Sequence, residues 1–439
     1  MKKKMLVLSG LFFNASGNQS MEQSVAGYMK DYDVTLVTAA NMNGTVYKTI
    51  EAVRERYPEL KIYAVGGTAI LSILVRLKKG INDFLGRGKV VDSQQVSIPA
   101  DTSGGIVNSP AGLGTRIFFC IREFILFFLC LFFSIFKKFD AVCAYEINAT
   151  RPIVWARRFF RGAPVLFGKF QGTVLGSVRH ALEREDVKRL YWMDLRGMEA
   201  VCKLDACIMT NDGTFGDAVL EKFGVSKRRI LFIPNGVALT RNGVKRVQDK
   251  QGIKIISVSR LTSWKRVHVV IMAVKILVEK YKRLDFSYDI YGIGSASEEK
   301  FIADFIKEMN LQDYVSYRGR LAHVDVVEAF MAADVLVSIY AHSNVCNPVF
   351  EASYLSVPVL TIDSEELKSI AGGASDSYFF VQDSDEDAVL AERVAEQLNG
   401  FNEVTLAAAV DCLRKNADSF NSWSERSVRE IEFIQSLAR

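Results

Sequence analysis

The segment from Ser343 to Asp363 limits the folds open to this chain more than any other stretch. A polar loop, Ser343–Asn347, leads to Pro348, whose fixed φ and missing N–H suit the first position of a helix. The apolar run Val357–Ile362 then has the length and composition of a short buried strand. A helix opened by a polar loop and followed by such a strand is typical of an α/β domain.

The same segment has the features of a binding site for an anion that is joined to hydroxyl groups. The N–H groups and the positive dipole end at the start of a helix favour an anion. Glu351 falls in the first turn of the predicted helix. An ionised carboxylate accepts the two hydrogen bonds that a sugar or ribose diol donates. The alternative is that Glu351 only complements the positive end of the helix.

A second segment places two cations at the edge of a predicted sheet. Ile255–Ser259 predicts a strand, and Val267–Tyr281 predicts an apolar helix after a polar turn. Arg260 follows the carboxyl end of the strand and Lys265 stands at the start of the helix. Open α/β sheets bind ligands at this edge, and two cations beside a helix N-terminus suit a diphosphate. The alternative is a pair of solvated surface charges.

Together these segments resemble a known family, the retaining nucleotide-sugar glycosyltransferases of family 4. The resemblance covers nearly the whole chain and is strongest from Lys254 to Asp363. The segments that carry it are Ile233–Val237, Val258–Leu261 with Lys265, Tyr288–Gly294, Tyr317–Arg320, Ala332–Val335, and Glu351–Ala352 with Val357–Val359. No one of these segments is specific, but their ordered set is.

The resemblance implies the α/β class and the GT-B fold, in which two Rossmann-like, doubly wound domains face each other across a cleft. Residues 1–238 would form the acceptor-side domain and residues 239–420 the domain that binds the nucleotide sugar. Residues 421–439 would form a last helix that crosses back to the first domain.

The resemblance also implies roles for particular residues. Arg260 and Lys265 would stabilise the diphosphate leaving group without a metal ion. Glu351 would hold the ribose, and an amide from Asn344 or Asn347 would orient the donor sugar. The remaining residues expected to contact substrate are Pro348, Val349, Gly294 and the backbone near Arg318 in the second domain, and Ser16, Gly17, Gln171 and Asn211 in the first.

Two positions depart from the family pattern. Ser343 stands where the family usually has the first of two glutamates spaced eight positions apart, of which Glu351 matches the second. A subset of the family has the Asn-Val-x-Asn-Pro version that this chain carries. Gln171 stands where the family often has His, and Gln still hydrogen-bonds a hydroxyl. The alternative is that Gln171 is a loop residue without contact to the substrate.

Charge is distributed unevenly along the chain. Residues 1–250 carry 36 Lys and Arg against 22 Asp and Glu, a net of +14, whereas residues 251–439 carry 19 against 28, a net of −9. A basic first half is typical of a protein that faces an anionic surface. We find no nucleic-acid recognition motif, so a membrane surface is the favoured partner.

Two apolar segments support that partner. Residues 69–89 are apolar with five interspersed cations, and they predict either a helix on a membrane surface or an ordinary amphipathic helix. Ile117–Phe136 is long enough to span a bilayer, but Arg122 and Glu123 interrupt it and leave thirteen uncharged residues. A span would put the two sides of one sheet across the membrane. The segment therefore predicts either a buried helix or a helix that dips into one leaflet.

Cysteine and histidine usage and the N-terminal segment indicate the cellular location and the cofactor requirement. The seven Cys form no CxxC pair, and the apolar run after Met1 is too short for a secretory signal, so we expect a cytoplasmic protein with reduced thiols. The four His are scattered, so we expect neither a metal ion nor another cofactor.

The sequence thus predicts a hexosyltransferase, metal-independent and peripheral on the cytoplasmic membrane face. It would move a sugar from a nucleotide diphosphate sugar, UDP-sugar favoured, to a lipid-linked or glycan acceptor of bacterial surface polysaccharide synthesis. The alternatives are an enzyme with a soluble small-molecule acceptor and a non-catalytic glycosyltransferase-like subunit.

Overall fold

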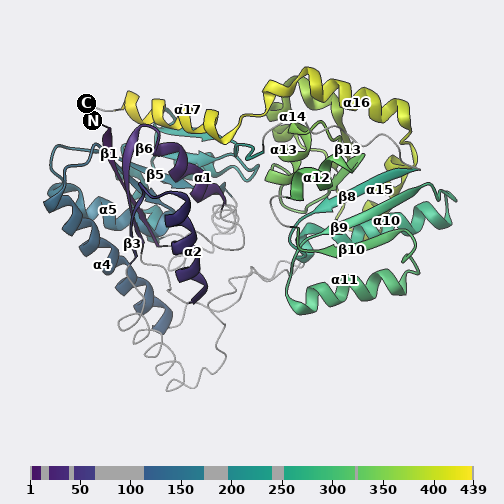
Figure 1. The fold of residues 1–439 in the computed structure, drawn as a ribbon, viewed down its shortest axis with the longest axis horizontal. Helices are drawn as coiled ribbons and strands as arrows, with labels where there is room; N and C mark the ends of the chain where they lie inside the picture. Colours follow the sequence, from purple (N-terminus) through teal and green to yellow (C-terminus); the bar gives the residue numbers. More distant parts are fainter. Residues whose placement is uncertain are drawn as a thin grey trace. The chain divides into compact units, whose positions relative to one another are not determined.

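The computed structural model describes residues 2–10, 19–38, 44–64, 113–172, 196–239, 252–321 and 325–437. These residues form two compact units, one that runs to Asn235 and resumes at Trp423, and one that runs from Gly236 to Ser422. Each unit contains one parallel β-sheet with helices packed on it (Figure 1). The prediction of two Rossmann-like α/β domains is confirmed.

The first unit contains a seven-stranded sheet in the order β3-β2-β1-β4-β5-β6-β7, in which every pair is parallel. Its strands are β1 (Lys3–Ser9), β2 (Tyr32–Thr38), β3 (Lys61–Ala64), β4 (Ala141–Tyr145), β5 (Val165–Phe170), β6 (Ala206–Thr210) and β7 (Ile230–Ile233). Its helices are α1 (Gln19–Tyr28), α2 (Gly44–Arg56), α4 (Leu113–Phe136), α5 (Thr150–Ala156), α8 (Arg196–Met198), α9 (Gly216–Lys222) and α17 (Trp423–Ser436).

The strands of this sheet are apolar on both sides because helices cover both faces. Successive side chains point to opposite faces, so Leu6 and Leu8 of β1 pack with α4, α5 and α9. Met5 and Val7 pack on the other face with α1, α2 and α17.

The second unit contains a six-stranded sheet in the order β10-β9-β8-β11-β12-β13, again parallel throughout. Its strands are β8 (Ile253–Val258), β9 (Phe286–Tyr291), β10 (Val315–Gly319), β11 (Val335–Ser338), β12 (Val359–Ile362) and β13 (Tyr378–Val381). Its helices are α10 (Val267–Glu279), α11 (Ala296–Glu308), α12 (Val326–Met331), α13 (Asn347–Tyr354), α14 (Glu365–Ala371), α15 (Asp387–Asn399) and α16 (Glu403–Lys415).

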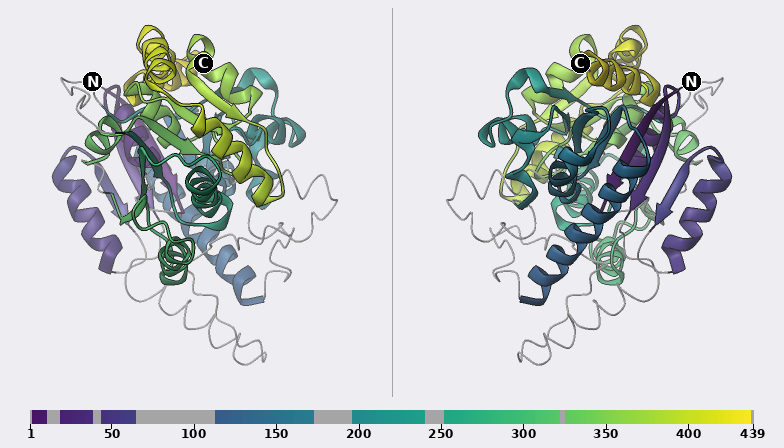
Figure 2. Two further views of the ribbon diagram at one scale, coloured as in Figure 1. Left: turned by 90° about the vertical axis from the view of Figure 1, so that its right-hand side faces the viewer. Right: turned by 90° about the vertical axis from the view of Figure 1, so that its left-hand side faces the viewer.

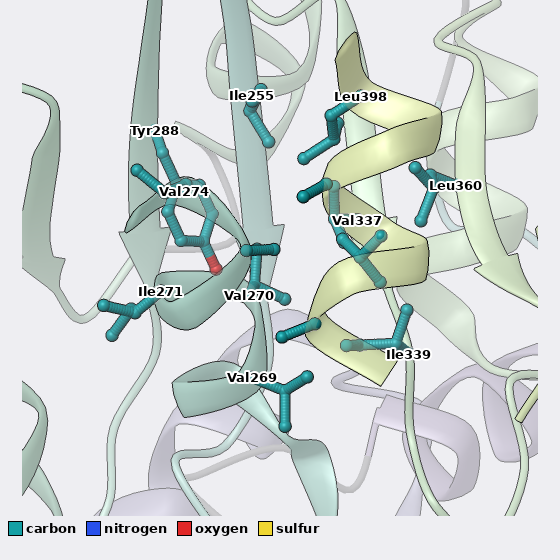
Figure 3. Packing of buried hydrophobic residues seen from close by; sticks show 14 of the residues in the cluster. Ile255, Val269, Val270, Ile271, Val274, Tyr288, Val337, Ile339, Leu360 and Leu398 are labelled. Carbon is teal, nitrogen blue, oxygen red and sulfur yellow. The ribbon is translucent and has the colours of Figure 1, made fainter. Parts of the chain in front are cut away.

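Apolar side chains fix α10 and α15 on one face of this second sheet. The two helices face the sheet with apolar side chains, Val270 and Val274 from α10 and Leu398 from α15. These side chains pack against strand residues such as Ile255 and Val337 (Figure 3). α12, α13 and α14 pack on the opposite face in a second cluster. The core therefore holds β8 and β11 rigidly, and the loops that leave these two strands start from fixed positions.

A buried group of charges holds α17 to the first sheet. Glu430 of α17 accepts hydrogen bonds from Lys169 Nζ at 2.6 Å, Arg426 Nε at 2.7 Å and Tyr28 Oη at 2.6 Å. Arg426 also donates to the carbonyl oxygen of Pro234 at 2.8 Å. Burial opposes ionisation of Glu430, but its three partners outweigh burial and lower its pKa to about 2. The stabilisation is therefore present above the unfolded pKa of about 4.3 and is lost as the pH falls toward 2.

Helix α4 is neither fully buried nor fully exposed. Leu126, Cys130 and Phe133 are buried against the sheet. On the opposite side, large apolar side chains are 42% to 68% exposed; they are Phe124, Phe128, Phe132, Ile135 and Phe136. The window Phe119–Phe136 is long and apolar enough to cross a membrane, with 28% of it buried. The right-hand view of Figure 2 shows α4, in blue, lying across the strands of the first sheet. Residues 69–89, the other apolar segment, lie outside the described residues.

Loss of the buried guanidinium should destabilise the first unit. In Arg426→Ala, Glu430 would keep a buried charge with one partner fewer, which typically costs about 3–5 kcal/mol of unfolding free energy. Urea unfolding followed by circular dichroism measures the change. Arg429→Ala, an exposed position on the same helix, is the control and should leave the unfolding midpoint nearly unchanged. Equal midpoints for the two variants would contradict a stabilising role for the buried charges.

Candidate active site

The structure brings the two predicted donor-binding segments of the second unit together. β8 and β11 are neighbouring parallel strands, so the loops that follow them leave the same edge of the sheet. The backbone N–H of Ala341 donates to the carbonyl oxygen of Trp264 at 2.9 Å and joins the two loops. Strand order reverses between β8 and β11, and ligand crevices of open α/β sheets form at such a reversal.

Lys265 lies against aromatic rings in the first of these loops. It ends the short 3-10 helix Ser263–Lys265, and its Nζ is 3.4 Å from the Tyr340 ring centroid and 3.9 Å from that of Trp264. In the described part of the chain no carboxylate forms an ion pair with it. The pKa of Lys265 is lowered to about 8, mainly by burial; the charge of Cys346 opposes this shift and the charge of Arg260 adds to it. A buried ammonium group without a carboxylate partner is strongly stabilised when an anionic ligand binds beside it.

Glu351 is a buried carboxyl group on α13. α13 begins at Asn347, so Glu351 stands in its second turn, one position further from the start than predicted. The side chain is 8% exposed, and burial raises its pKa to about 7. Among the described residues, its carboxyl group forms no hydrogen bond or ion pair. Its distance from the first turn argues against the alternative that Glu351 only complements the helix terminus.

Cys346 connects the two groups electrostatically. It is the N-cap of α13, and burial raises the pKa of its thiol. The charge of Lys265 lowers that pKa and the charge of Glu351 raises it. The Cys346 sulfur is therefore within electrostatic reach of both side chains. Arg260 is exposed, and its charge lowers the pKa of Lys265. Arg260 therefore lies within electrostatic reach of Lys265 as well.

Asn344 has a structural role that the sequence does not reveal. The side chain is 4% exposed, and its Oδ1 accepts hydrogen bonds from the backbone N–H of Tyr340 at 2.9 Å and from Ser338 Oγ at 3.1 Å. Its Nδ2 donates to the carbonyl oxygen of Tyr340 at 3.1 Å. These bonds fix the loop between β11 and α13, so Asn344 has little capacity left for a sugar.

The other predicted residues near the start of α13 lie as follows. Asn347 is the first residue of the helix and Pro348 the second, one position later than the sequence predicts for this proline. The backbone N–H of Val349 interacts with the Cys346 sulfur, and the Val349 side chain is buried.

Two further predicted residues lie near the edge strands of the second sheet. Gly294 follows β9, and Arg318 belongs to β10. Gly294 lies before α11, and its N–H donates to Glu299 Oε1 at 3.1 Å. The Arg318 guanidinium pairs with the buried Asp289 carboxylate at 2.8 Å, which leaves the backbone of this strand for any contact with a base.

In the first unit, the predicted residues stand at the carboxyl ends of two strands. Gln171 directly follows β5, and its Nε2 donates to Tyr145 Oη at 3.4 Å. Asn211 directly follows β6, and its Oδ1 accepts from the N–H of Gly213 at 3.2 Å. Ser16 and Gly17 lie outside the described residues.

Sequence reasoning missed a further carboxyl group, Glu146. It directly follows β4 and is 7% exposed, and burial raises its pKa to about 8. The signal that could have found it is an acidic residue directly after a predicted buried strand. In the described ranges, no group of three or more His, Cys, Asp and Glu side chains is arranged to hold a metal ion.

The second unit is similar in sequence to a known protein family. Residues 241–403 match the family model described as Glycosyl transferases group 1. The second unit carries a glycosyltransferase group 1 domain. The chain is therefore a transferase of the glycosyltransferase class. No curated protein sequence matches it.

Solved structures extend the similarity to the fold of the whole chain. A glycosyltransferase from Rickettsia africae is 12% identical with a TM-score of 0.62, over 100% of this chain and 99% of that one. Staphylococcus aureus TarM, solved with fondaparinux, alpha-GlcNAc-glycerol and UDP, is 15% identical with a TM-score of 0.59, over 100% of both chains. An Escherichia coli trehalose-6-phosphate protein bound with UDP-2-fluoro glucose is 12% identical with a TM-score of 0.68, over 98% of this chain and 99% of that one. This glycosyltransferase has the GT-B fold.

The structural role of Asn344 can be tested by substitution. Asn344→Ala removes three hydrogen bonds from a buried loop, and leaving their backbone partners unpaired should lower the unfolding free energy by about 1–3 kcal/mol. Urea unfolding measures this. Asn399→Ala, exposed at the end of α15, is the control. Unchanged stability together with weaker nucleotide-sugar binding would return Asn344 to the set of ligand contacts.

Proposed function

We propose that this glycosyltransferase transfers a hexose from a nucleotide diphosphate sugar, UDP-sugar favoured, to a hydroxyl acceptor with retention of configuration. The observation that carries the proposal is the pair formed by Lys265 and Glu351. A cation and a carboxyl group, each without an ion-pair partner in the described part of the chain, lie at the β8–β11 reversal within reach of one thiol. A nucleotide sugar carries the two groups that complement them, a diphosphate and a ribose diol.

The chemistry follows from where charge develops. The bond between the anomeric carbon and the diphosphate oxygen breaks, and its electron pair stays on the diphosphate. A bond from the acceptor oxygen to the same face of the anomeric carbon forms, and the acceptor proton leaves to the diphosphate or to water. Lys265, Arg260 and the first N–H groups of α13 would stabilise the developing negative charge. Side chains and backbone would do this work without a metal ion.

The remaining roles concern orientation. Glu351 would accept hydrogen bonds from the ribose hydroxyls, and Asn347 with Pro348 would bring the start of α13 against the donor sugar. The backbone at Arg318 and Gly294 would contact the base. Ser343 has no carboxylate to offer, so this site holds the sugar with fewer charges than the common family pattern does.

The pH dependence of donor binding should show the titration of both Glu351 and Lys265. Raising the pH through about 7 ionises Glu351 and strengthens binding, and raising it through about 8 removes the Lys265 charge and weakens binding. Calorimetry with UDP-glucose, UDP-galactose and UDP-N-acetylglucosamine should therefore give an affinity maximum between these values. Glu351→Gln should lose the acidic limb and about 1–3 kcal/mol of affinity.

The matched variants separate the two limbs. Lys265→Ala should remove the alkaline limb, and Arg260→Ala should also abolish transfer while the protein stays folded. Lys280→Ala, an exposed position at the end of α10, is the control and should keep the full profile. A profile that is flat from pH 6 to pH 9 in the wild type would contradict the assignment of both residues.

We further propose that the acceptor is lipid-linked or a glycan and that the enzyme acts at the cytoplasmic face of an anionic membrane. Four phenylalanines, Phe124, Phe128, Phe132 and Phe136, recur every fourth residue on α4 and are exposed; we name them the α4 stripe. Lys138 packs against Gly162, which puts the exposed Phe159 and Arg161 of that turn beside the end of α4.

This combination suits a bilayer interface. Aromatic side chains insert at the boundary between headgroups and acyl chains, and neighbouring cations bind anionic headgroups. Leu126, Cys130 and Phe133 pack in the core, so the helix would lie along the surface. A soluble sugar acceptor is the rival, and turnover with a soluble acceptor in the absence of lipid would favour it.

Flotation with vesicles tests the membrane proposal. The wild type should float with phosphatidylglycerol vesicles and less with phosphatidylcholine vesicles, because the cations add to apolar insertion. Phe128→Ser with Phe132→Ser should stay in the soluble fraction. The matched control is Phe301→Ser on α11, which removes an exposed phenylalanine from the second unit. Wild-type protein that remains soluble with both vesicle types would overturn the proposal.

A further inference from the structure

Glu146 occupies the position in the first unit that corresponds to the donor-binding edge of the second. The first sheet has the order β3-β2-β1-β4-β5-β6-β7, so its strand order reverses between β1 and β4. Glu146 directly follows β4, at the carboxyl edge of the sheet. Ligand crevices of doubly wound sheets form at this reversal. The described residues of the first unit thus place a carboxyl group where its fold favours a ligand.

The backbone of Glu146 is held in a conformation that side chains other than glycine rarely adopt. Its φ is 70° and its ψ is 162°, in a region that is essentially restricted to glycine. Two backbone hydrogen bonds hold it there. Its N–H donates to the carbonyl oxygen of Lys169 at 3.0 Å, and its carbonyl oxygen accepts from the N–H of Ala149 at 3.2 Å. A strained residue that keeps a long polar side chain at a ligand-binding edge points to a function for that side chain.

The environment of its carboxyl group differs from that of a structural acid. Glu430 and Glu123 are also buried, but Glu430 is paired with Lys169 and Arg426, and Glu123 with Arg196. The Glu146 carboxyl group forms no hydrogen bond or ion pair within the described residues. Burial keeps it largely protonated near neutral pH, with the charge of Lys169 opposing this. A protonated carboxyl group both donates and accepts, which matches an alcohol hydroxyl.

Other polar groups gather at the same edge. Gly10 ends the β1 side of the reversal, and its Cβ position would lie 3.4 Å from Asn148 Cβ and 3.6 Å from Arg122 Cζ. Gln171 follows the neighbouring strand β5 and bonds the Tyr145 hydroxyl. A guanidinium, a carboxyl group and an amide thus lie at the ends of β1, β4 and β5, and such groups suit a polyhydroxylated ligand.

We infer that Glu146 binds the hydroxyl group of the acceptor that attacks the donor sugar, and that the acceptor is a polyhydroxylated compound such as a sugar or polyol. This inference rests on the proposed function, because it assigns the acceptor side of that reaction. Glu146 directs the acceptor oxygen by a hydrogen bond. Glu351 of the second unit has a different proposed role, because its ionised carboxylate would only accept hydrogen bonds from the ribose hydroxyls.

Water, as the simplest hydroxyl acceptor, provides the test. The donor is the member of the panel UDP-glucose, UDP-galactose and UDP-N-acetylglucosamine that raises the wild-type Tm most, and its hydrolysis is measured. Glu146→Gly should raise Tm because glycine relieves the strained backbone. It should also lower kcat for hydrolysis by about tenfold, the loss of one hydrogen bond, with the KM for donor unchanged. Glu146→Gln keeps the hydrogen bond and should retain most of kcat.

Lys282→Gly is the matched control. Lys282 is exposed, has φ 52° and lies before β9, so glycine there should raise Tm without changing hydrolysis. Equal kcat for wild type and Glu146→Gly, or a lower Tm for Glu146→Gly, would overturn the inference and make Glu146 a structural residue. If no nucleotide sugar of the panel binds to the wild type in calorimetry, the proposed function fails instead, and the two failures are distinct.

Discussion

Parallel strand pairing is the constraint on which the rest of this structure depends. Every strand of a parallel sheet ends at the same edge, and each reversal of strand order leaves two neighbouring loops that separate and leave room for a ligand. The first unit reverses between β1 and β4 and the second between β8 and β11. The Lys265 and Glu351 segments meet at the second reversal although more than sixty residues of chain separate Val267 from Asp334. Glu146 stands at the first.

Buried charges divide into two kinds in this protein. Glu430 is fully paired, its pKa is lowered, and it holds the C-terminal helix to the first sheet. Glu351 and Glu146 are also buried, but no described cation pairs with them, and burial raises the pKa of each. A buried acid without a partner costs stability, so its retention at a ligand-binding edge is best explained by the ligand that completes it.

Helix α4 combines two environments along one helix. One side supplies core residues such as Leu126 and the other presents the α4 stripe. A purely structural helix on a soluble domain normally turns polar side chains outward, because exposed apolar area gains nothing in water. The prediction of a buried helix therefore holds for one of its faces, and the prediction of a helix at one leaflet stays a prediction for the other.

The sequence by itself determined the α/β class, the strands and helices around Lys265 and Glu351, and the expectation that these two side chains lie at one edge of the second sheet. These are local properties: apolar runs, Pro348 at a helix start, and the order of short motifs. The roles of Asn344 and Glu146 were decided only by tertiary structure. Asn344 has the composition of a ligand contact, yet its amide is used by Ser338 and Tyr340, and Glu146 became notable only when β1, β4 and β5 surrounded it. Burial, partners and backbone strain depend on residues distant in the chain, and no local pattern records them.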